Sequence, residues 1–201
     1  GKNMKKYKIK ICIIDLGISN LTSIINGCNY LNYNVGVSNS FQRLKESDVI
    51  ILPGVGAFPY AMKQINSAEL NKKLSDLNLK KKTIVGICLG MQLMTEESFE
   101  HVHTNGIGLI EGKTECFIDK SINTGWNSVK SINGDKNHFY FTHSYYVKPK
   151  NNMIITSTST HNGTIFCSSF LQDKKLGFQF HPEKSGIKGL NFLDKAIRET
   201  L

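Results

Sequence analysis

A strand that runs directly into a tight Gly-x-Cys-x-Gly turn constrains this 201-residue chain more than any other feature. Residues 83–87 (Thr-Ile-Val-Gly-Ile) form an apolar run typical of a buried strand, and a helical pattern begins immediately after Cys88. Glycines at 86 and 90 let the two elements pack closely, while Cys88 takes a strained backbone conformation between them. We expect the Cys88 side chain to rise above the carboxyl edge of a parallel sheet toward solvent, where the helix N-terminus favours the thiolate. The pattern predicts a nucleophile elbow with cysteine in place of serine.

A candidate base lies far downstream, where an apolar run ends in His181-Pro182-Glu183. Because residues two apart point the same way in an extended chain, we expect Glu183 to lie beside His181 and to orient its ring. Cys88, His181 and Glu183 would then form a relay of nucleophile, proton carrier and orienting carboxylate. Cys88 alone would be as well explained as an ordinary buried cysteine. The two motifs together, each at a strand end, favour the catalytic interpretation.

Length and composition are typical of one domain with a sizeable core, and we place that domain at residues 4–201. Residues 1–3 are interpreted as a non-native remnant ahead of Met4. No apolar run approaches the roughly 18 residues of a membrane span, and no signal peptide is visible, so we expect no membrane partner. Five cysteines without framework spacing predict free thiols in a reducing cytoplasm.

The net charge of +9 comes from scattered lysines, which we interpret as solvated surface. Because no stripe of basic and aromatic residues accompanies them, we expect no nucleic-acid partner. His101 and His103 have a spacing seen among metal ligands, but no third ligand lies nearby in the sequence. We therefore expect neither a metal nor a cofactor.

The order of the predicted elements indicates an α/β fold. The first half alternates expected strands, at 9–15, 35–37, 49–52 and 83–87, with expected helices at 21–31 and 62–77. The expected helix at 62–77 has a break near Ser67. From 107 to 180 the chain is a series of short β-rich runs between polar turns, and 189–200 forms a closing helix. This order predicts a central, mostly parallel mixed sheet flanked by helices, with antiparallel strands in the second half.

A second glycine turn, Pro53-Gly54-Val55-Gly56, follows the expected strand at 49–52. Two glycines let backbone N–H groups approach a ligand closely, as an oxyanion hole requires. The N–H of Leu89, next after the candidate nucleophile, would be the second donor. An ordinary strand-to-helix turn would also explain the glycines. The position of the turn at a strand end in the same half as the elbow favours an oxyanion hole.

Taken together, these motifs resemble those of the class I (triad) glutamine amidotransferases. The resemblance is carried by Pro-Gly-Val-Gly-Ala-Phe at 53–58, Gly-Ile-Cys-Leu-Gly-Met-Gln at 86–92 and Phe-His-Pro-Glu-Lys-Ser at 180–185. Gly-Ile-Gly-Leu-Ile at 106–110, Gly-Trp-Asn at 125–127 and Thr-His-Ser-Tyr-Tyr at 142–146 narrow it to the HisH family, the glutaminase subunit of imidazole glycerol phosphate synthase. The likeness covers nearly the whole chain and implies the fold of these enzymes.

The resemblance implies hydrolysis of L-glutamine to glutamate and ammonia. Cys88 would attack the side-chain amide and form a thioester, and His181, oriented by Glu183, would protonate the leaving ammonia and then activate water. The amino-acid head of the substrate would be held by Gln92, Thr142, Ser144 and Tyr145. The free subunit would be nearly inactive until a partner flips a peptide within residues 54–56.

The resemblance also implies a heterodimer with a (β/α)8-barrel synthase subunit of the HisF family. That partner would use the ammonia to make imidazole glycerol phosphate in histidine biosynthesis. Trp126, Asn127 and Lys184 match positions expected at the subunit interface. A core tryptophan at 126 and an ordinary surface lysine at 184 are the alternatives.

Two departures from the family pattern keep other interpretations open. Ser19 stands where the turn after the first strand usually has a second glycine, and Ile122-Asn123-Thr124 replaces the usual Pro-His/Gln-Met/Ile. Some relatives supply ammonia to a synthase that makes amidino groups on bacterial surface sugars, and this chain would serve such a partner by the same chemistry. A catalytically silent regulatory subunit is a further alternative, but the intact relay argues against it.

Overall fold

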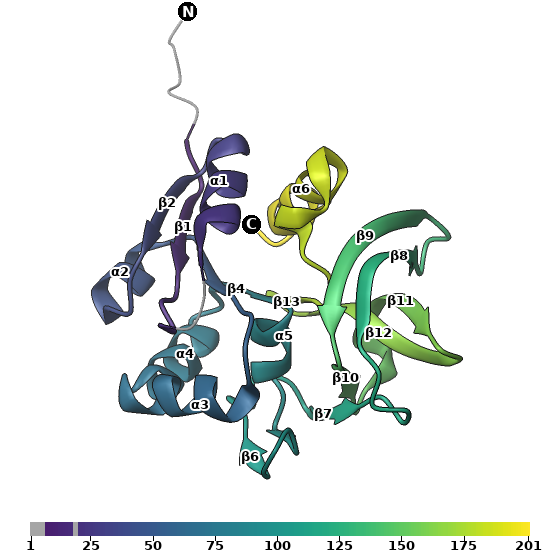
Figure 1. The fold of residues 1–201 in the computed structure, drawn as a ribbon. Helices are drawn as coiled ribbons and strands as arrows, with labels where there is room; N and C mark the ends of the chain where they lie inside the picture. The colour runs from purple at the N-terminus through teal and green to yellow at the C-terminus, as the bar shows by residue number, and fades with distance from the viewer. Residues whose placement is uncertain (1–6, 18–19) are drawn as a thin grey trace, which may run out of the picture.

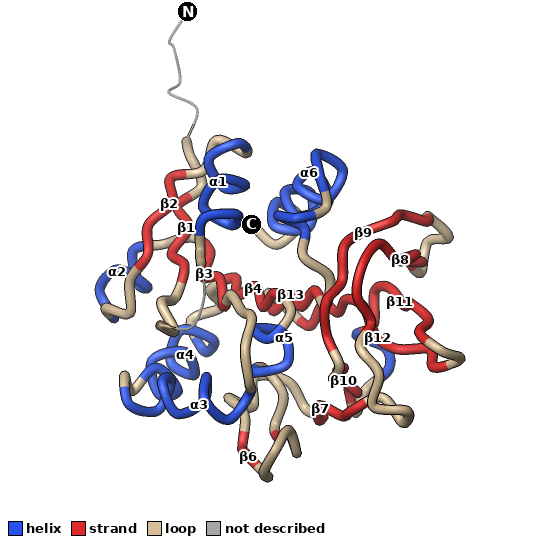
Figure 2. The backbone as a smooth tube through the Cα atoms, viewed as in Figure 1, coloured by secondary structure: helices blue, strands red, loops and turns tan. Residues whose placement is uncertain are grey.

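The computed structural model describes residues 7–17 and 20–201, and within them a nine-stranded mixed sheet forms the centre of the molecule (Figure 1). Its strand order is β2-β1-β3-β4-β13-β12-β11-β8-β9. Helices α1 and α6 lie on one face of the parallel part, and α3, α4 and α5 lie on the other (Figures 1 and 2). The expected α/β fold with a central mixed sheet is confirmed. The possible remnant at 1–3 and the Ser19 departure lie outside the described residues.

The parallel part of the sheet comes from the first half of the chain together with one late strand. Four strands alternate with five helices along the described first half: β1 (Lys10–Ile13), α1 (Thr22–Tyr30), β2 (Asn34–Val37), α2 (Phe41–Glu46), β3 (Val49–Leu52), α3 (Phe58–Ser67), α4 (Leu70–Leu79), β4 (Thr83–Ile87) and α5 (Leu89–Leu93). Strand β13 (Lys175–Phe178) returns from the second half and pairs with β4 in parallel. The end of β13, which leads to His181, therefore lies beside the end of β4, which leads to Cys88.

The antiparallel part comes from the second half, as predicted. Its elements are β8 (Asn123–Ser131), β9 (Lys136–His143), β11 (Ile155–His161) and β12 (Thr164–Gln172), followed after β13 by α6 (Gly186–Arg198). A second sheet of four strands in the described chain, ordered β10-β7-β5-β6, was not predicted. It contains β5 (Glu97–Ser98), β6 (Thr104–Asn105), β7 (Gly112–Cys116) and β10 (Tyr145–Pro149). Two short 3-10 turns, η1 (Asn152–Ile154) and η2 (Pro182–Lys184), complete the second half.

Several element boundaries differ from the predictions for identifiable reasons. The break expected near Ser67 separates α3 from α4, where Glu69 has a φ of +56°. Helix α2 was missed because it has one buried residue, Leu44, and therefore no periodic pattern. Its start is instead marked by Ser40, whose side chain accepts a hydrogen bond from the N–H of Arg43.

The hydrophobic core lies in two layers, one on each face of the central sheet. One layer packs β3 and β4 against α3, α4 and α5, and the other packs the sheet against α1 and α6. Every residue of β3 and β4 is buried, because both faces of these strands are covered. The two strands that precede the glycine turns are thus part of the buried centre of the molecule.

Two of the sequence expectations concern thiols and membrane spans. All five cysteines are free thiols in the structure, four of them buried and Cys116 half-buried. No helix in the described chain has the length and apolar character needed to cross a membrane.

The close contact between α5 and the sheet depends on missing β-carbons. A Cβ at position 90 would lie 1.9 Å from the carbonyl oxygen of Leu52 in β3. A Cβ at position 86 would lie 2.6 Å from the carbonyl oxygen of Gly90. Both distances are far below van der Waals contact, so the predicted role of these glycines is confirmed.

We predict that Gly90→Ala destabilises the protein by at least about 3 kcal/mol, because backbone atoms of β3 would have to move. Gly36→Ala in β2 is the matched control, since a Cβ there meets nothing within 4 Å, and it should change stability by less than about 1 kcal/mol. Urea unfolding of the two variants measures the difference. Equal stabilities would contradict the packing argument.

Candidate active site

Cys88 occupies the turn between β4 and α5 in the strained conformation expected of an elbow. Its φ of 53° and ψ of −110° lie in a region that a non-glycine residue rarely adopts. Its N–H donates to the Phe178 carbonyl over 2.7 Å, and its carbonyl accepts from the Gln92 N–H over 3.3 Å. These bonds to β13 and α5 hold the turn in place.

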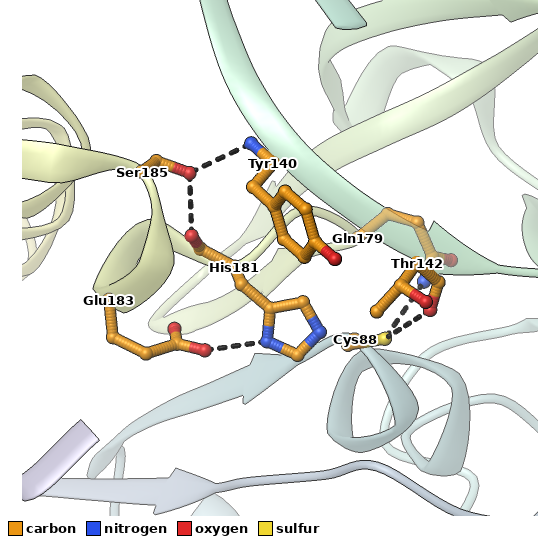
Figure 3. Close-up of polar contacts among 7 residues, drawn as sticks. All are labelled: Cys88, Tyr140, Thr142, Gln179, His181, Glu183 and Ser185. Carbon is orange, nitrogen blue, oxygen red and sulfur yellow. Dashed lines mark hydrogen bonds and ion pairs between the residues drawn. The ribbon is translucent and has the colours of Figure 1, made fainter. Parts of the chain in front are cut away.

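The prediction that the Cys88 side chain points to solvent is wrong. Cys88 is only 5% exposed, because neighbouring segments from the second half of the chain cover its sulfur. The Thr142 carbonyl at the end of β9 lies 3.8 Å from Sγ, and the side-chain amide of Gln179 donates to Sγ over 3.7 Å (Figure 3). The thiol therefore lies in a sheltered site between β4 and β9.

His181 and Glu183 form the contact that the sequence predicted, but by a different local geometry. Nδ1 of His181 and Oε1 of Glu183 are 2.5 Å apart, and both side chains are buried. The chain is not extended here: Pro182–Lys184 is a 3-10 turn. This turn, rather than strand alternation, brings the carboxylate under the imidazole ring.

Ser185 fastens this turn to the edge of the sheet (Figure 3). Its hydroxyl donates to the His181 carbonyl over 2.6 Å and accepts from the Tyr140 N–H over 2.9 Å. The His181 N–H in turn donates to the Tyr140 carbonyl over 2.9 Å. Tyr140 of β9 thus uses both of its backbone polar groups to position His181.

The electrostatic environment favours the imidazolium form of His181. Burial disfavours the charge, but Cys88 on one side of the ring and Glu183 on the other outweigh it and raise the His181 pKa to about 10. Nε2 is buried on the side of the ring toward Cys88 and has no hydrogen-bond partner among the described residues (Figure 3). A proton on Nε2 is therefore available to a group that enters beside the sulfur.

The second glycine turn lies against the elbow. A Cβ on Gly54 would lie 2.6 Å from Cβ of Leu89, so the turn packs directly on the first residue of α5. Gly56 has a φ of +128°, a conformation that favours glycine. Val55 between them is 38% exposed. The structure thus brings together all four residues predicted to form the oxyanion hole.

The predicted substrate-binding residues converge on the same place from α5 and the β9–β10 junction. Gln92 is buried one turn after Cys88, and its Nε2 donates to the Tyr145 carbonyl over 2.9 Å. Thr142, Ser144 and Tyr145 are half-buried. The Ser144 carbonyl accepts from the Phe117 N–H over 3.1 Å, which fixes the backbone at the junction.

The predicted interface residues lie at the surface near the candidate triad. Trp126 is 61% exposed, and its ring is T-shaped to that of Tyr140, so a core tryptophan is excluded. Lys184 is exposed, and Asn127 is half-buried. A cavity of about 110 Å³ is lined by His181, Val55 and Lys184. Asn20 also lines it.

Sequence reasoning missed three residues of this site: Gln179, Ser185 and Glu100. In an extended chain, side chains two residues apart point the same way, so Gln179 lies on the same side as His181. This alternation was the sequence signal that could have identified Gln179. No local pattern predicted Glu100, whose carboxylate accepts from the Phe58 N–H over 3.1 Å at the start of α3. Glu100 lies in the β5–β6 connection, 42 residues after Phe58 in the sequence.

The sequence profile of the glutamine amidotransferase class-I family matches residues 12–197, nearly the whole chain. The chain belongs to the class I glutamine amidotransferase family. The expected glutamine amidotransferase enzyme is thereby confirmed, and the Gly-x-Cys-x-Gly elbow lies within the matched region.

Among individual amidotransferases, the chain is similar to several named as imidazole glycerol phosphate synthase subunit HisH. It is 36% identical to that of Aquifex aeolicus, with 95% of this chain and 97% of the relative covered. It is 35% identical to that of Haemophilus influenzae, with 93% and 98% covered. The solved structure of PurLQS from Thermotoga maritima has the same fold, with a TM-score of 0.76 at 15% identity over 96% of this chain and 99% of that one.

His143 gives the site a testable pH dependence. Burial lowers its pKa to about 4, although its hydrogen bond to the Tyr145 carbonyl works in the opposite direction. An unfolded histidine titrates near 6.5, so the unfolded state gains a proton first as the pH falls. We predict that the free energy of unfolding drops by roughly 3 kcal/mol between pH 6.5 and 4 from this residue alone.

The variant His143→Gln should remove this part of the pH dependence. Its unfolding free energy, measured with urea at intervals from pH 7 to 4, should fall less steeply than that of the unmodified protein. His138→Gln, at an exposed position on the same strand, is the control and should keep the original slope. A parallel slope in both variants would show that His143 is not the source.

Proposed function

We propose that this protein hydrolyses L-glutamine and passes the ammonia to a (β/α)8-barrel synthase subunit that makes imidazole glycerol phosphate in histidine biosynthesis. The observation that carries the proposal is the juxtaposition of Cys88, His181 and Glu183 at the ends of two neighbouring parallel strands. The similarity to proteins named as HisH subunits, at about 36% identity over nearly the full length, supports the choice of pathway.

In the first half of the reaction, the Cys88 thiolate attacks the side-chain amide carbon of glutamine. The negative oxygen that develops would accept hydrogen bonds from backbone N–H groups of the turn at 54–56 and from the N–H of Leu89. His181 then donates its Nε2 proton to the departing nitrogen, which leaves as ammonia while a thioester remains on Cys88. Glu183 holds Nδ1 throughout and keeps the ring oriented.

The group that raises the pKa of His181 explains how this residue would act in the second half of the reaction. Cys88 is the main group that raises it, and the sulfur loses its negative charge once it forms the thioester. His181 is then a weaker acid and a better base, as activation of a hydrolytic water requires. Attack by that water releases glutamate and restores the thiolate and imidazolium.

The hydrogen bonds of Gln92 indicate which part of the substrate it would meet. Its Nε2 donates to the Tyr145 carbonyl and, over 3.4 Å, to Oε1 of Gln179, so both amide hydrogens are used. The remaining group is Oε1, an acceptor. We propose that Gln92 accepts from an N–H of the substrate, while the junction at 142–145 receives its carboxylate.

The surface around Trp126, Asn127 and Lys184 is the proposed contact with the synthase partner in a heterodimer. A large aromatic side chain left 61% exposed near the site is typical of an interface anchor. The cavity lined by His181, Val55 and Lys184 supports this choice, because it connects the candidate base with the surface at Lys184. The free thiols fit a cytoplasmic protein.

A partner that makes amidino groups on surface sugars is the second candidate. It is favoured by Asn123, which departs from the histidine-pathway pattern and lies in β8 three residues before Trp126. The glutaminase chemistry would be unchanged. A catalytically silent subunit is the third candidate, and the buried, paired His181 and Glu183 argue against it.

Glutamine turnover with and without a histidine-pathway synthase subunit from the same source tests the proposal. We predict strong stimulation of glutamate release by that subunit and its nucleotide substrate. In Cys88→Ala, glutamate release should fall to the uncatalysed level, while synthase activity of the complex with added ammonium salt should persist, because only the nucleophile is lost.

The same assay separates the candidates. No stimulation, with Cys88 still labelled by a glutamine-analogue electrophile, would move the partner to the surface-sugar pathway. No labelling would support the silent subunit. Glutamate release by Cys88→Ala at the original rate would refute the nucleophile assignment.

Trp126→Ala tests the partner surface. Because the side chain is mostly exposed, stability should change by less than about 1 kcal/mol. Affinity for the synthase subunit should fall at least about tenfold, as for an aromatic anchor. Met153→Ala, which removes an 89% exposed side chain in η1, is the control and should bind normally. Isothermal titration calorimetry measures both variants, and equal affinities would exclude Trp126 as an anchor.

A further inference from the structure

Gln179 is a fully buried amide in direct contact with the candidate nucleophile. It lies between the end of β13 and His181, has no exposed surface, and is tied to β12 by a backbone bond to the Ser168 carbonyl. Its Nε2 donates to Cys88 Sγ over 3.7 Å (Figure 3). A buried amide is costly unless it is hydrogen-bonded, so the positions of its oxygen and nitrogen matter.

The Tyr145 carbonyl determines the orientation of the Gln179 amide through the side chain of Gln92. The Tyr145 carbonyl can only accept, so the Gln92 group 2.9 Å away must be its NH2. That NH2 also faces Gln179 over 3.4 Å, so the Gln179 atom there must be its oxygen. The NH2 of Gln179 is left to face the sulfur. A flipped Gln179 would set donor against donor at Gln92 and lose its bond to Sγ.

His143 fixes the same carbonyl from its other side. Nδ1 of His143 donates to the Tyr145 oxygen over 2.8 Å, and Nε2 accepts from the Asn123 side-chain amide over 3.0 Å. With two donors the Tyr145 oxygen is fully used. These contacts hold neutral His143 in the Nδ1–H tautomer, so the alignment of the amides does not depend on its titration at neutral pH.

Two neighbours of the sulfur favour opposite protonation states. The Thr142 carbonyl, 3.8 Å from Sγ, can accept only from a thiol S–H. The Gln179 amide, on the other hand, donates to the sulfur and interacts more strongly with a thiolate, because hydrogen bonds to a charged acceptor are stronger. Removal of the Gln179 amide would leave the carbonyl unopposed except by His181.

We infer that Gln179 is a positioning residue that holds the Cys88 sulfur as a thiolate, and that Gln92 and the Tyr145 carbonyl fix its orientation. The inference deepens the proposed glutaminase function and rests on it for its catalytic meaning. It adds to the triad a neutral donor to the sulfur, beside the charged imidazolium of His181.

Other titratable groups near the sulfur stay in place when Gln179 is changed. His181 interacts with Cys88 directly, and Glu183 acts through His181. His143 at the end of β9 is neutral, and Tyr145 of β10 is in the field of Glu100 and Cys116. A comparison of the unmodified protein with Gln179→Met, which has nearly the same volume, therefore isolates the amide.

The test is the pH dependence of Cys88 alkylation by iodoacetamide, followed by mass spectrometry of the Cys88 peptide in the isolated full chain. We expect Gln179→Met to raise the pH midpoint of alkylation by about one unit, because a hydrogen bond to a charged group is worth about a factor of ten or more. Gln64→Met, at a half-buried position in α3, is the control and should leave the midpoint unchanged.

Gln92→Met tests the orientation without touching the sulfur. It should raise the midpoint by less than Gln179→Met, and the double variant should behave as Gln179→Met alone, because Gln92 acts through Gln179. Additive shifts would overturn the proposed orientation. An unchanged midpoint in a Gln179→Met protein with normal circular dichroism would overturn the inference. If Gln179→Met fails to fold, an unchanged alkylation midpoint in Gln92→Met would overturn the inference instead.

Alkylation needs neither glutamine nor a partner, so this experiment does not depend on the proposed function. If Gln179→Met shows the shifted midpoint but the unmodified protein never hydrolyses glutamine, the inference about the sulfur stands and the glutaminase function is refuted. If the unmodified protein hydrolyses glutamine but Gln179→Met shows no shift, the glutaminase function stands and the inference about the sulfur is refuted.

Discussion

The contact of α5 with β3 and β4 is the interaction on which the rest of the site depends. Two backbone segments approach so closely at Gly90 and Leu52 that no side chain fits between them. The turn at Cys88, the first helical residue Leu89 and the packed Gly54 turn consequently behave as one body. The candidate nucleophile Cys88 and both arms of the proposed oxyanion hole are therefore held in fixed positions relative to one another by β3 and β4, whose residues are all buried.

What could be predicted from the sequence was what local patterns determine. The Gly-x-Cys-x-Gly turn, the buried run of β3 and the alternation of strands with helices each depend on a few neighbouring residues, and these features are found as expected. The burial of Cys88 could not be predicted, because Thr142, 54 residues away, supplies part of the cover. The 3-10 turn at Glu183 and the roles of Gln179 and Ser185 likewise depend on contacts with distant strands.

Two buried histidines in this site have opposite electrostatic behaviour, and their partners explain why. His181 faces a carboxylate and a cysteine sulfur, so its charged form is favoured despite burial. His143 is also buried but contacts only a carbonyl and a neutral amide, so burial lowers its pKa. The charged form of His181 suits the proton transfer proposed for it, and neutral His143 keeps its hydrogen bonds to Tyr145 and Asn123.

The use of Tyr140 to hold His181 has a consequence for colloidal behaviour. Strand β9 is the edge of the nine-stranded sheet, and an edge strand offers unpaired backbone groups to other chains. At Tyr140 those groups are occupied by Ser185 and by His181 itself. The turn that carries His181 thus also covers the sheet edge at Tyr140. Loosening of this turn would free the backbone groups of Tyr140 to pair with a strand of another molecule, and it would displace His181 at the same time.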